Sequence, residues 1–172
     1  MGFVCVAGCS FGLPDSPPAP LTDAAGDAGD AAGAVCPAGY VMLAGAPSLY
    51  RVVDAGTTWE GAQADCADDG TITHLAVPEN EAEYLALADV VSGATRWLGV
   101  SDRKIEGVWI PIIVNAMGYF DHWAGSEPNA QDCLSVNRNT DYEAMPCKDP
   151  DPQWFKGFFC ECDGHAVDPA AF

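Results

Sequence analysis

Basic residues are scarce in this chain: seven Lys and Arg stand against 25 Asp and Glu, and no basic residue precedes Arg51. The resulting net charge of -18 repels the phosphates of nucleic acids and anionic membranes. We therefore exclude nucleic acid as a partner, and the charge favours cations as small ligands. An acidic surface also keeps a protein soluble, so the charge alone indicates no particular ligand.

Long apolar runs are also absent, because no segment approaches the roughly 20 apolar residues that span a bilayer. We therefore expect no membrane-spanning segment. Residues 1–9 are apolar, and Val6-Ala7-Gly8-Cys9 resembles the lipobox at which bacterial lipoproteins are lipidated on cysteine. A basic start is missing, however, and the apolar stretch is short for a signal peptide. Three interpretations stay open: a lipid anchor at Cys9 as the sole membrane contact, an ordinary secretion signal, or no signal.

Zinc-binding cysteine patterns are missing although the chain has eight cysteines. The one close pair is Cys160-Glu161-Cys162, and neither a two-residue-spaced knuckle nor paired histidines accompany it. A disulfide framework is the better interpretation, and disulfides persist outside the reducing cytoplasm. We therefore expect an extracytoplasmic protein, either secreted or lipid-anchored at the cell surface.

Catalytic motifs are missing as well: the chain has no nucleophile elbow, phosphate loop or zinc helix. Its three histidines are scattered, and we expect His74 to be a packing residue with satisfied hydrogen bonds. Glu127 with Asp132 or Glu143 could form a glycosidase pair, but carboxylate pairs arise easily by chance in so acidic a chain. We predict that the protein is not an enzyme.

Composition divides the 172 residues into one folded domain and its extensions. Residues 10–35 are rich in Pro, Ala, Gly and Asp and cannot build a core, so they predict a disordered linker. We expect the folded domain over residues 36–163 and a C-terminal tail over 164–172.

Two helices and several strands are predicted within the domain. Thr57 and Glu60 form a capping box for a first helix, which carries Trp59, Ala62 and Cys66 at helical spacing and stops at Gly70. A second helix opens at residues 78–80 and closes at Gly93. Extended segments are expected at residues 50–53, 74–77, 96–100, 107–110, 133–136 and 157–160. This order predicts an α+β fold with the helices segregated from antiparallel strands.

Oxygen-bearing side chains gather in the segment from Trp123 to Cys133. Glu127, Asn129, Gln131 and Asp132 lie within six residues and offer the carboxylate and amide oxygens that calcium prefers. Pro128 fixes one backbone dihedral, and an X-Pro bond can be cis, so its two neighbours can be aimed at one point. A surface turn rich in Asn, Asp and Pro is the competing interpretation.

A series of motifs in compatible order and spacing resembles the C-type lectin domain, and the lipobox-like start suggests a bacterial secreted or lipoprotein type. The motifs are Cys36-Pro37-Ala38-Gly39-Tyr40, Thr58-Trp59 with Ala62 and Cys66, His74-Leu75-Ala76-Val77, Trp97-Leu98-Gly99-Val100, Glu106-Gly107-Val108-Trp109, Glu127-Pro128-Asn129, Asp132-Cys133, Cys147 and Phe159-Cys160-Glu161. The resemblance implies two helices plus antiparallel strands with long loops and disulfides, and carbohydrate or glycoconjugate as the ligand.

The resemblance also implies two disulfides, Cys66 with Cys160 and Cys133 with Cys147. Family members with an N-terminal extension usually have another cysteine near the position of Leu49, and this chain lacks it. Cys162, two residues after Cys160, is the remaining partner, so we predict a bridge from Cys36 to Cys162.

Calcium-dependent family members hold one calcium through five side chains, which the sugar hydroxyls then join. Glu127 and Asn129 match two of them, Gln131 replaces a Glu, and Glu143 and Ala144 stand where an Asn-Asp pair occurs. We expect Glu127, Asn129, Gln131 and Glu143 to bind calcium weakly at best, because calcium takes six to eight oxygens. An auxiliary calcium site of the family corresponds to Asp102, Glu106 and Asp132, although Ala130 replaces a further Asp.

Two functional hypotheses follow. The first is an extracytoplasmic lectin with a degenerate Glu-Pro-Asn site for calcium and sugar. The second is a calcium-independent module of the same fold that binds protein or another surface ligand.

Overall fold

The computed structural model describes residues 35–91, 93–148 and 155–172. The predicted signal segment, the lipidation site at Cys9 and all of the predicted linker except Val35 lie outside these residues. Within the described residues, each helix is too short or too polar to cross a bilayer.

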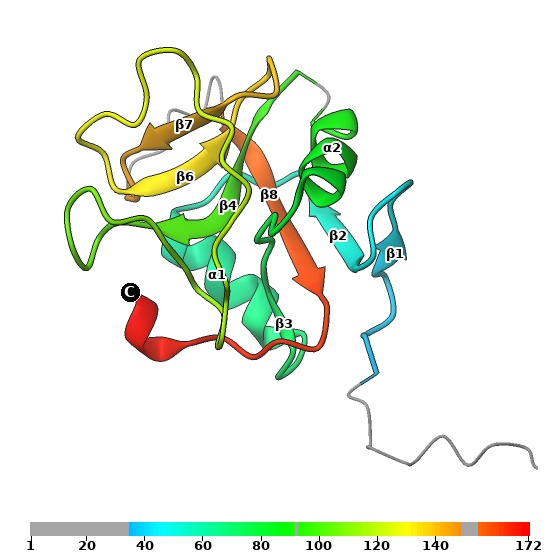
Figure 1. The fold of residues 1–172 in the computed structure, drawn as a ribbon. Helices are drawn as coiled ribbons and strands as arrows, with labels where there is room; N and C mark the ends of the chain where they lie inside the picture. The colour runs from blue at the N-terminus through cyan, green and yellow to red at the C-terminus, as the bar shows by residue number, and fades with distance from the viewer. Residues whose placement is uncertain (1–34, 92, 149–154) are drawn as a thin grey trace, which may run out of the picture. The chain divides into compact units, whose positions relative to one another are not determined.

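The described chain is built on one eight-stranded sheet (Figure 1). Its strands are β1 (Val41–Met42), β2 (Leu49–Val53), β3 (Thr73–Leu75), β4 (Thr95–Ser101), β5 (Ile110–Pro111), β6 (Cys133–Val136), β7 (Tyr142–Met145) and β8 (Phe155–Cys162). The main path runs β1-β2-β8-β4-β6-β7, while β3 pairs with β8 and β5 pairs with β4. The other pairings are antiparallel, as expected, but β4 and β8 run parallel, so the sheet is mixed.

The described residues form two α-helices, as predicted. Helix α1 (Trp59–Asp68) has Thr58 as its N-cap, whose hydroxyl accepts a hydrogen bond from the Gly61 N–H at 3.0 Å. The predicted cap at Thr57 is therefore wrong by one residue. Helix α2 (Glu81–Asp89) is capped by Asn80, whose side chain accepts from the Glu83 N–H. Each cap satisfies an N–H group that has no partner inside its helix.

Helix α1 packs its apolar face on the sheet. Trp59 and Trp97 are fully buried, and each indole nitrogen donates to a backbone carbonyl: Trp59 to Leu98 and Trp97 to Thr57, both at 2.8 Å. The backbone N–H of Trp59 also donates to the Cys147 carbonyl at 2.9 Å. These bonds satisfy the polar atoms of the largest core side chains, as burial requires.

Three disulfides cross-link the domain. They join Cys66 to Cys160, Cys133 to Cys147 and Cys36 to Cys162, the same pairs that the sequence suggested. Two of the three end on β8, so this strand is bonded covalently both to α1 and to the first described residues of the chain.

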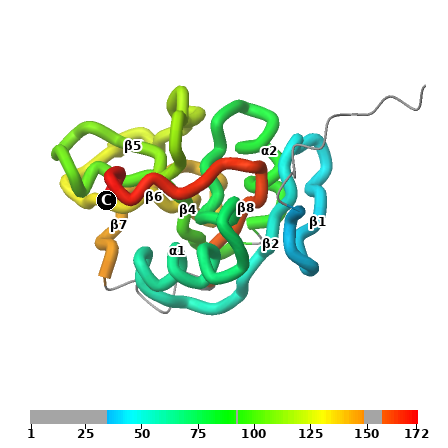
Figure 2. The backbone as a smooth tube through the Cα atoms, turned by 90° about the horizontal axis from the view of Figure 1, so that it is seen from below, coloured from blue at the N-terminus to red at the C-terminus, as the bar shows by residue number. Residues whose placement is uncertain are grey.

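Residues 164–172, expected as a tail, pack on the domain. The Val114 N–H donates to the Ala166 carbonyl, and the Asp168 N–H donates to the Ile112 carbonyl. A short 3-10 helix, η1 (Pro169–Ala171), brings the Phe172 ring edge-on to Trp59, with centroids 5.8 Å apart. Figure 2 shows this segment running from the end of β8 along the domain.

Candidate functional site

The predicted ligand loop is attached to β7, a strand that the sequence analysis did not predict. The Ala124 N–H donates to the Tyr142 carbonyl at 3.0 Å, and the Tyr142 N–H donates to the His122 carbonyl at 2.9 Å. Trp123 forms an isolated parallel bridge with Tyr142. The backbone of β7 therefore fixes where the loop begins.

Aromatic side chains pack beneath the start of this loop. The Trp123 ring lies edge-on to Trp109, with centroids 4.7 Å apart, and contacts Tyr142 at 6.1 Å. Tyr142 is 1% exposed, its burial raises the pKa of the phenol, and its hydroxyl has no hydrogen-bond partner among the described residues. The loop thus rests on an apolar base, and its polar side chains are left at the rim.

Glu127 and Asn129 are brought together at this rim. The Glu127–Pro128 peptide bond is cis. One oxygen of Glu127, Oε2, accepts from the Asn129 and Ala144 N–H groups at 3.0 and 3.1 Å, and Oε1 accepts from Asn129 Nδ2 at 2.9 Å. Asn129 Nδ2 also donates to the Ala144 carbonyl at 3.4 Å. The Glu-Pro-Asn segment is therefore ordered by hydrogen bonds within the protein.

Gln131 lies apart from this group. It lines a pocket of about 330 Å³ with Arg103, Asp132, Lys148 and the Cys147 end of a disulfide. Among the described residues, no hydrogen bond joins Gln131 to Glu127 or Asn129. The structure therefore does not show Gln131 joining them as a ligand.

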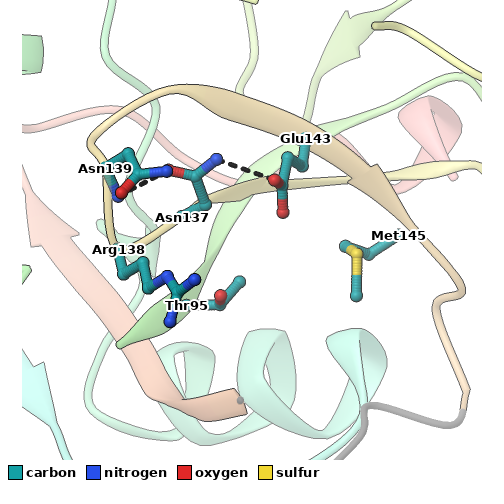
Figure 3. A pocket seen from close by; sticks show the side chains of 6 residues that line it. All are labelled: Thr95, Asn137, Arg138, Asn139, Glu143 and Met145. Atoms are coloured by element: carbon teal, nitrogen blue, oxygen red, sulfur yellow. Dashed lines mark hydrogen bonds between the residues drawn. The ribbon is translucent and has the colours of Figure 1, made fainter. Parts of the chain in front are cut away.

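Glu143 is directed into a different pocket, shown in Figure 3. Its Oε1 accepts from Asn137 Nδ2 at 2.7 Å. Neighbouring side chains alternate between the two faces of a strand, so Glu143 and Met145 share a face that Ala144 does not. This pocket of about 250 Å³ is lined by Thr95, Asn137, Arg138, Asn139, Glu143 and Met145.

Asn137 is a site residue that sequence reasoning missed. It is 5% exposed, and its Oδ1 accepts from the N–H groups of Asn139 and Asp141 at 2.7 and 3.1 Å. It thereby orders the turn between β6 and β7 and positions Glu143. The run Asn-Arg-Asn-Thr-Asp before Tyr142 is a turn signal that could have revealed this hairpin.

The predicted auxiliary calcium residues are only partly gathered. The Asp102 N–H donates to the Asp132 carbonyl at 3.1 Å, and Asp102 Oδ2 accepts from the Gly107 N–H. Asp102 is 3% exposed, and its Oδ1 has no partner among the described residues. Glu106 is exposed. Of the described His, Cys, Asp and Glu residues, two groups bring three ligand atoms within 4.8 Å of one another, and neither contains Asp102, Glu106 or Asp132.

The predicted calcium ligands do not form one coordination shell. Glu127 and Asn129 adjoin each other, but Gln131 and Glu143 line two other pockets. Both Glu127 oxygens already accept hydrogen bonds from the protein, and calcium takes six to eight oxygens. This donor set does not fit a tight calcium site.

Comparison with known proteins assigns the fold. Residues 55–154 match the family described as the lectin C-type domain, which is 100 of the 172 residues. Mouse lymphocyte antigen 75 is 23% identical over 124 residues, covering 70% of this chain and 7% of that protein. Chicken mannose-binding protein is 30% identical over 86 residues, covering 48% of this chain and 33% of that protein. These relatives are animal proteins, so they do not support the bacterial lipoprotein type suggested by the sequence.

Solved structures agree with this assignment. The carbohydrate-recognition domain of cow CD23, determined in the presence of a GlcNAc2Man3 oligosaccharide, has a TM-score of 0.62 at 18% identity. The match covers 74% of this chain and 95% of the CD23 chain. A calcium-independent type II antifreeze protein has a TM-score of 0.61 at 24% identity, covering 77% of this chain and 95% of its own. The predicted fold, with two helices and long loops, is thereby confirmed.

Proposed function

Because this chain belongs to the C-type lectin domain family, we propose that it is a non-enzymatic binding module that recognises carbohydrate through the Glu127–Asn129 rim without a tightly bound calcium. The observation that carries the proposal is the closed set of hydrogen bonds among Glu127, Asn129 and Ala144. These bonds order the rim without an ion.

The rim retains acceptors for sugar hydroxyls. Asn129 is exposed, its side-chain oxygen accepts no hydrogen bond from the described residues, and a carboxylate such as Glu127 has more lone pairs than the three donors occupy. Adjacent acceptors of this kind suit the neighbouring O–H groups of a saccharide. The half-buried Trp123 beneath them adds an apolar surface beside the polar rim.

Relatives support carbohydrate as the ligand class. The chicken relative is named for binding mannose, and the cow CD23 domain was determined with an oligosaccharide present. An antifreeze protein of the same fold is described as calcium-independent, so the fold itself does not require calcium. Since this chain spans 7% and 33% of the two relatives named above, their complete activities are not transferred to it.

Three disulfides support an extracytoplasmic location, because such bonds are stable where thiols are not kept reduced. Secretion and lipid anchoring through Cys9 remain alternative predictions.

Glycan-array binding with and without EDTA tests the proposed function. We expect a saccharide signal that EDTA leaves unchanged, that Glu127→Ala and Asn129→Ala abolish, and that Glu106→Ala, at an exposed carboxylate outside the rim, preserves. Loss of the signal in EDTA that Ca²⁺ restores and Zn²⁺ does not would instead identify a calcium-dependent lectin. Absence of any glycan signal from folded protein would point to a protein or another surface ligand.

A further inference from the structure

Three side chains of the types that can bind a metal lie close together beyond the carboxyl end of β8. Glu79 precedes α2, and Asp163 and His165 follow β8, yet one ligand atom from each lies within 4.8 Å of the other two. All three line a pocket of about 540 Å³, which Asn80 and the largely buried Glu83 also line. None belongs to the Glu127–Asn129 rim or to the predicted calcium ligands.

The distances suit a small cation. Three atoms no more than 4.8 Å apart all lie within about 2.8 Å of a common point, whereas zinc bonds to nitrogen and oxygen are about 2.0–2.2 Å long. Side-chain movements of under about 1 Å would therefore bring all three atoms to bonding distance. Each of the three residues is partly exposed, so these side chains have room to move.

The core holds Asp163 in a fixed orientation. Its Oδ1 lies 3.1 Å from Nε2 of the fully buried His74 and accepts from the His165 N–H at 2.8 Å. The other ring nitrogen of His74 contacts the Leu75 carbonyl at 2.9 Å, which fixes the ring. Such partners behind a carboxylate orient it toward a metal and increase affinity. Asp163 Oδ2 has no hydrogen bond among the described residues and is free to bind.

The surroundings carry an excess of negative charge. Glu79, Glu83 and Asp163 line the pocket. No described Lys or Arg lines this pocket, and the one ion pair found for these carboxylates is that of Asp163 with His74. Without a cation, these partly buried carboxylates repel one another. A divalent cation at the pocket mouth would offset that repulsion.

We propose that Glu79, Asp163 and His165 form a binding site for a divalent transition metal of the zinc type. An imidazole with two carboxylates suits zinc and its neighbours, whereas calcium prefers oxygen ligands alone. Three protein ligands leave a fourth position, which the open pocket makes accessible to water or to a donor atom from another molecule.

Cobalt titration of the untagged full chain, after dialysis against EDTA, tests this site. We expect one equivalent of Co²⁺ to give visible d–d absorption that Zn²⁺ removes, and Zn²⁺ to raise the melting temperature. His165→Ala and Glu79→Gln should each weaken Co²⁺ binding by about tenfold or more. Removing a residue that only hydrogen-bonds to a metal ligand already lowers metal affinity by about tenfold, and these variants remove a ligand itself. Circular dichroism checks that these variants are folded.

His122→Ala is the matched control, because His122 is also partly exposed but lies on the loop before Trp123. We expect it to bind Co²⁺ as the natural chain does. The proposal is overturned if Co²⁺ gives no absorption, if folded His165→Ala retains full affinity, or if Ca²⁺ alone stabilises the protein at this pocket. Because none of these measurements uses a glycan, failure of the metal site and failure of carbohydrate binding are distinguishable.

Discussion

The Glu127 carboxylate accepts a hydrogen bond from the backbone N–H of Ala144 at 3.1 Å, across 17 positions of the chain. This bond ties the Glu-Pro-Asn segment to β7 at the position where calcium-dependent relatives are expected to have an Asp side chain. Because this contact uses a backbone N–H, it does not depend on which side chain stands at position 144.

Glu127→Ala should lower the free energy of unfolding by about 1–2 kcal/mol. The change leaves the Asn129 and Ala144 N–H groups without their acceptor, and partial access to water limits the loss. Urea unfolding followed by tryptophan fluorescence measures it. Glu106→Ala removes an exposed carboxylate that forms no hydrogen bond or ion pair with the described residues, and should change stability by less than about 0.5 kcal/mol. Equal losses in the two variants would contradict the role assigned to Glu127.

Removal of one hydroxyl should have opposite consequences at two buried tyrosines. Tyr50 donates to Glu161 Oε1 at 2.9 Å, so Tyr50→Phe leaves a buried carboxyl short of a donor and should cost about 1–3 kcal/mol. The Tyr142 hydroxyl is buried and has no hydrogen-bond partner among the described residues, so Tyr142→Phe should be neutral or stabilising. Thermal and urea unfolding of the two variants provide the comparison. A larger loss in Tyr142→Phe would show that its hydroxyl has a partner.

Stability should fall with rising pH above about 10. Burial, together with the hydrogen bond to Asp69, raises the pKa of Tyr40 to about 12, and burial also raises the pKa values of Tyr50 and Tyr142. Unfolded tyrosine ionises near pH 10, so above that pH the unfolded chain releases protons that the folded chain keeps. The free energy of unfolding then decreases by up to about 1.4 kcal/mol per pH unit for each phenol.

Urea unfolding at a series of alkaline pH values, with phenolate absorbance of the folded protein, measures this dependence. Tyr40→Phe should reduce the slope of stability against pH between about 10 and 12. An unchanged slope in this variant would contradict the raised pKa of Tyr40.

Gly99→Ala should destabilise the domain by about 3 kcal/mol or prevent folding. An added Cβ would lie 2.4 Å from the Leu75 carbonyl oxygen and 3.0 Å from Ile112, both in the core. Gly125→Ala, in the ligand loop, adds a Cβ that meets no atom of the described chain within 4 Å, and should change stability by less than about 1 kcal/mol. Soluble yield and thermal unfolding of the two variants check the difference. Equal stability of both would show that β3 and β4 can move apart at no cost.

Local patterns predicted the helices and the fold class because burial and capping act over short distances. Trp59, Ala62 and Cys66 share one face of a helix, and all three are buried in α1. Asn80 begins α2 after Pro78, as the residues around that proline indicated. At α1 the neighbouring threonines Thr57 and Thr58 both offer a hydroxyl, and only their backbone geometry selects Thr58.

Longer-range pairing was not predictable in the same way. Thr95 and Phe155 begin strands that run parallel, and this direction depends on how the intervening loops cross the sheet. Strand β7 was missed because four residues, Tyr142–Met145, give a weak alternation pattern. Because β7 was missed, the sequence did not show that Glu143 and Ala144 occupy opposite faces of a strand, nor that Glu143 lines a pocket whose lining does not include Glu127.

The Cys36–Cys162 bridge joins residues 126 positions apart, and the other two bridges lie within that span. A protease that cut any single peptide bond between Cys36 and Cys162 would therefore release no fragment from the domain. The nick would be revealed on a gel only after reduction. In a protease-rich environment, one scission in a surface loop would leave all parts of this domain attached to one another.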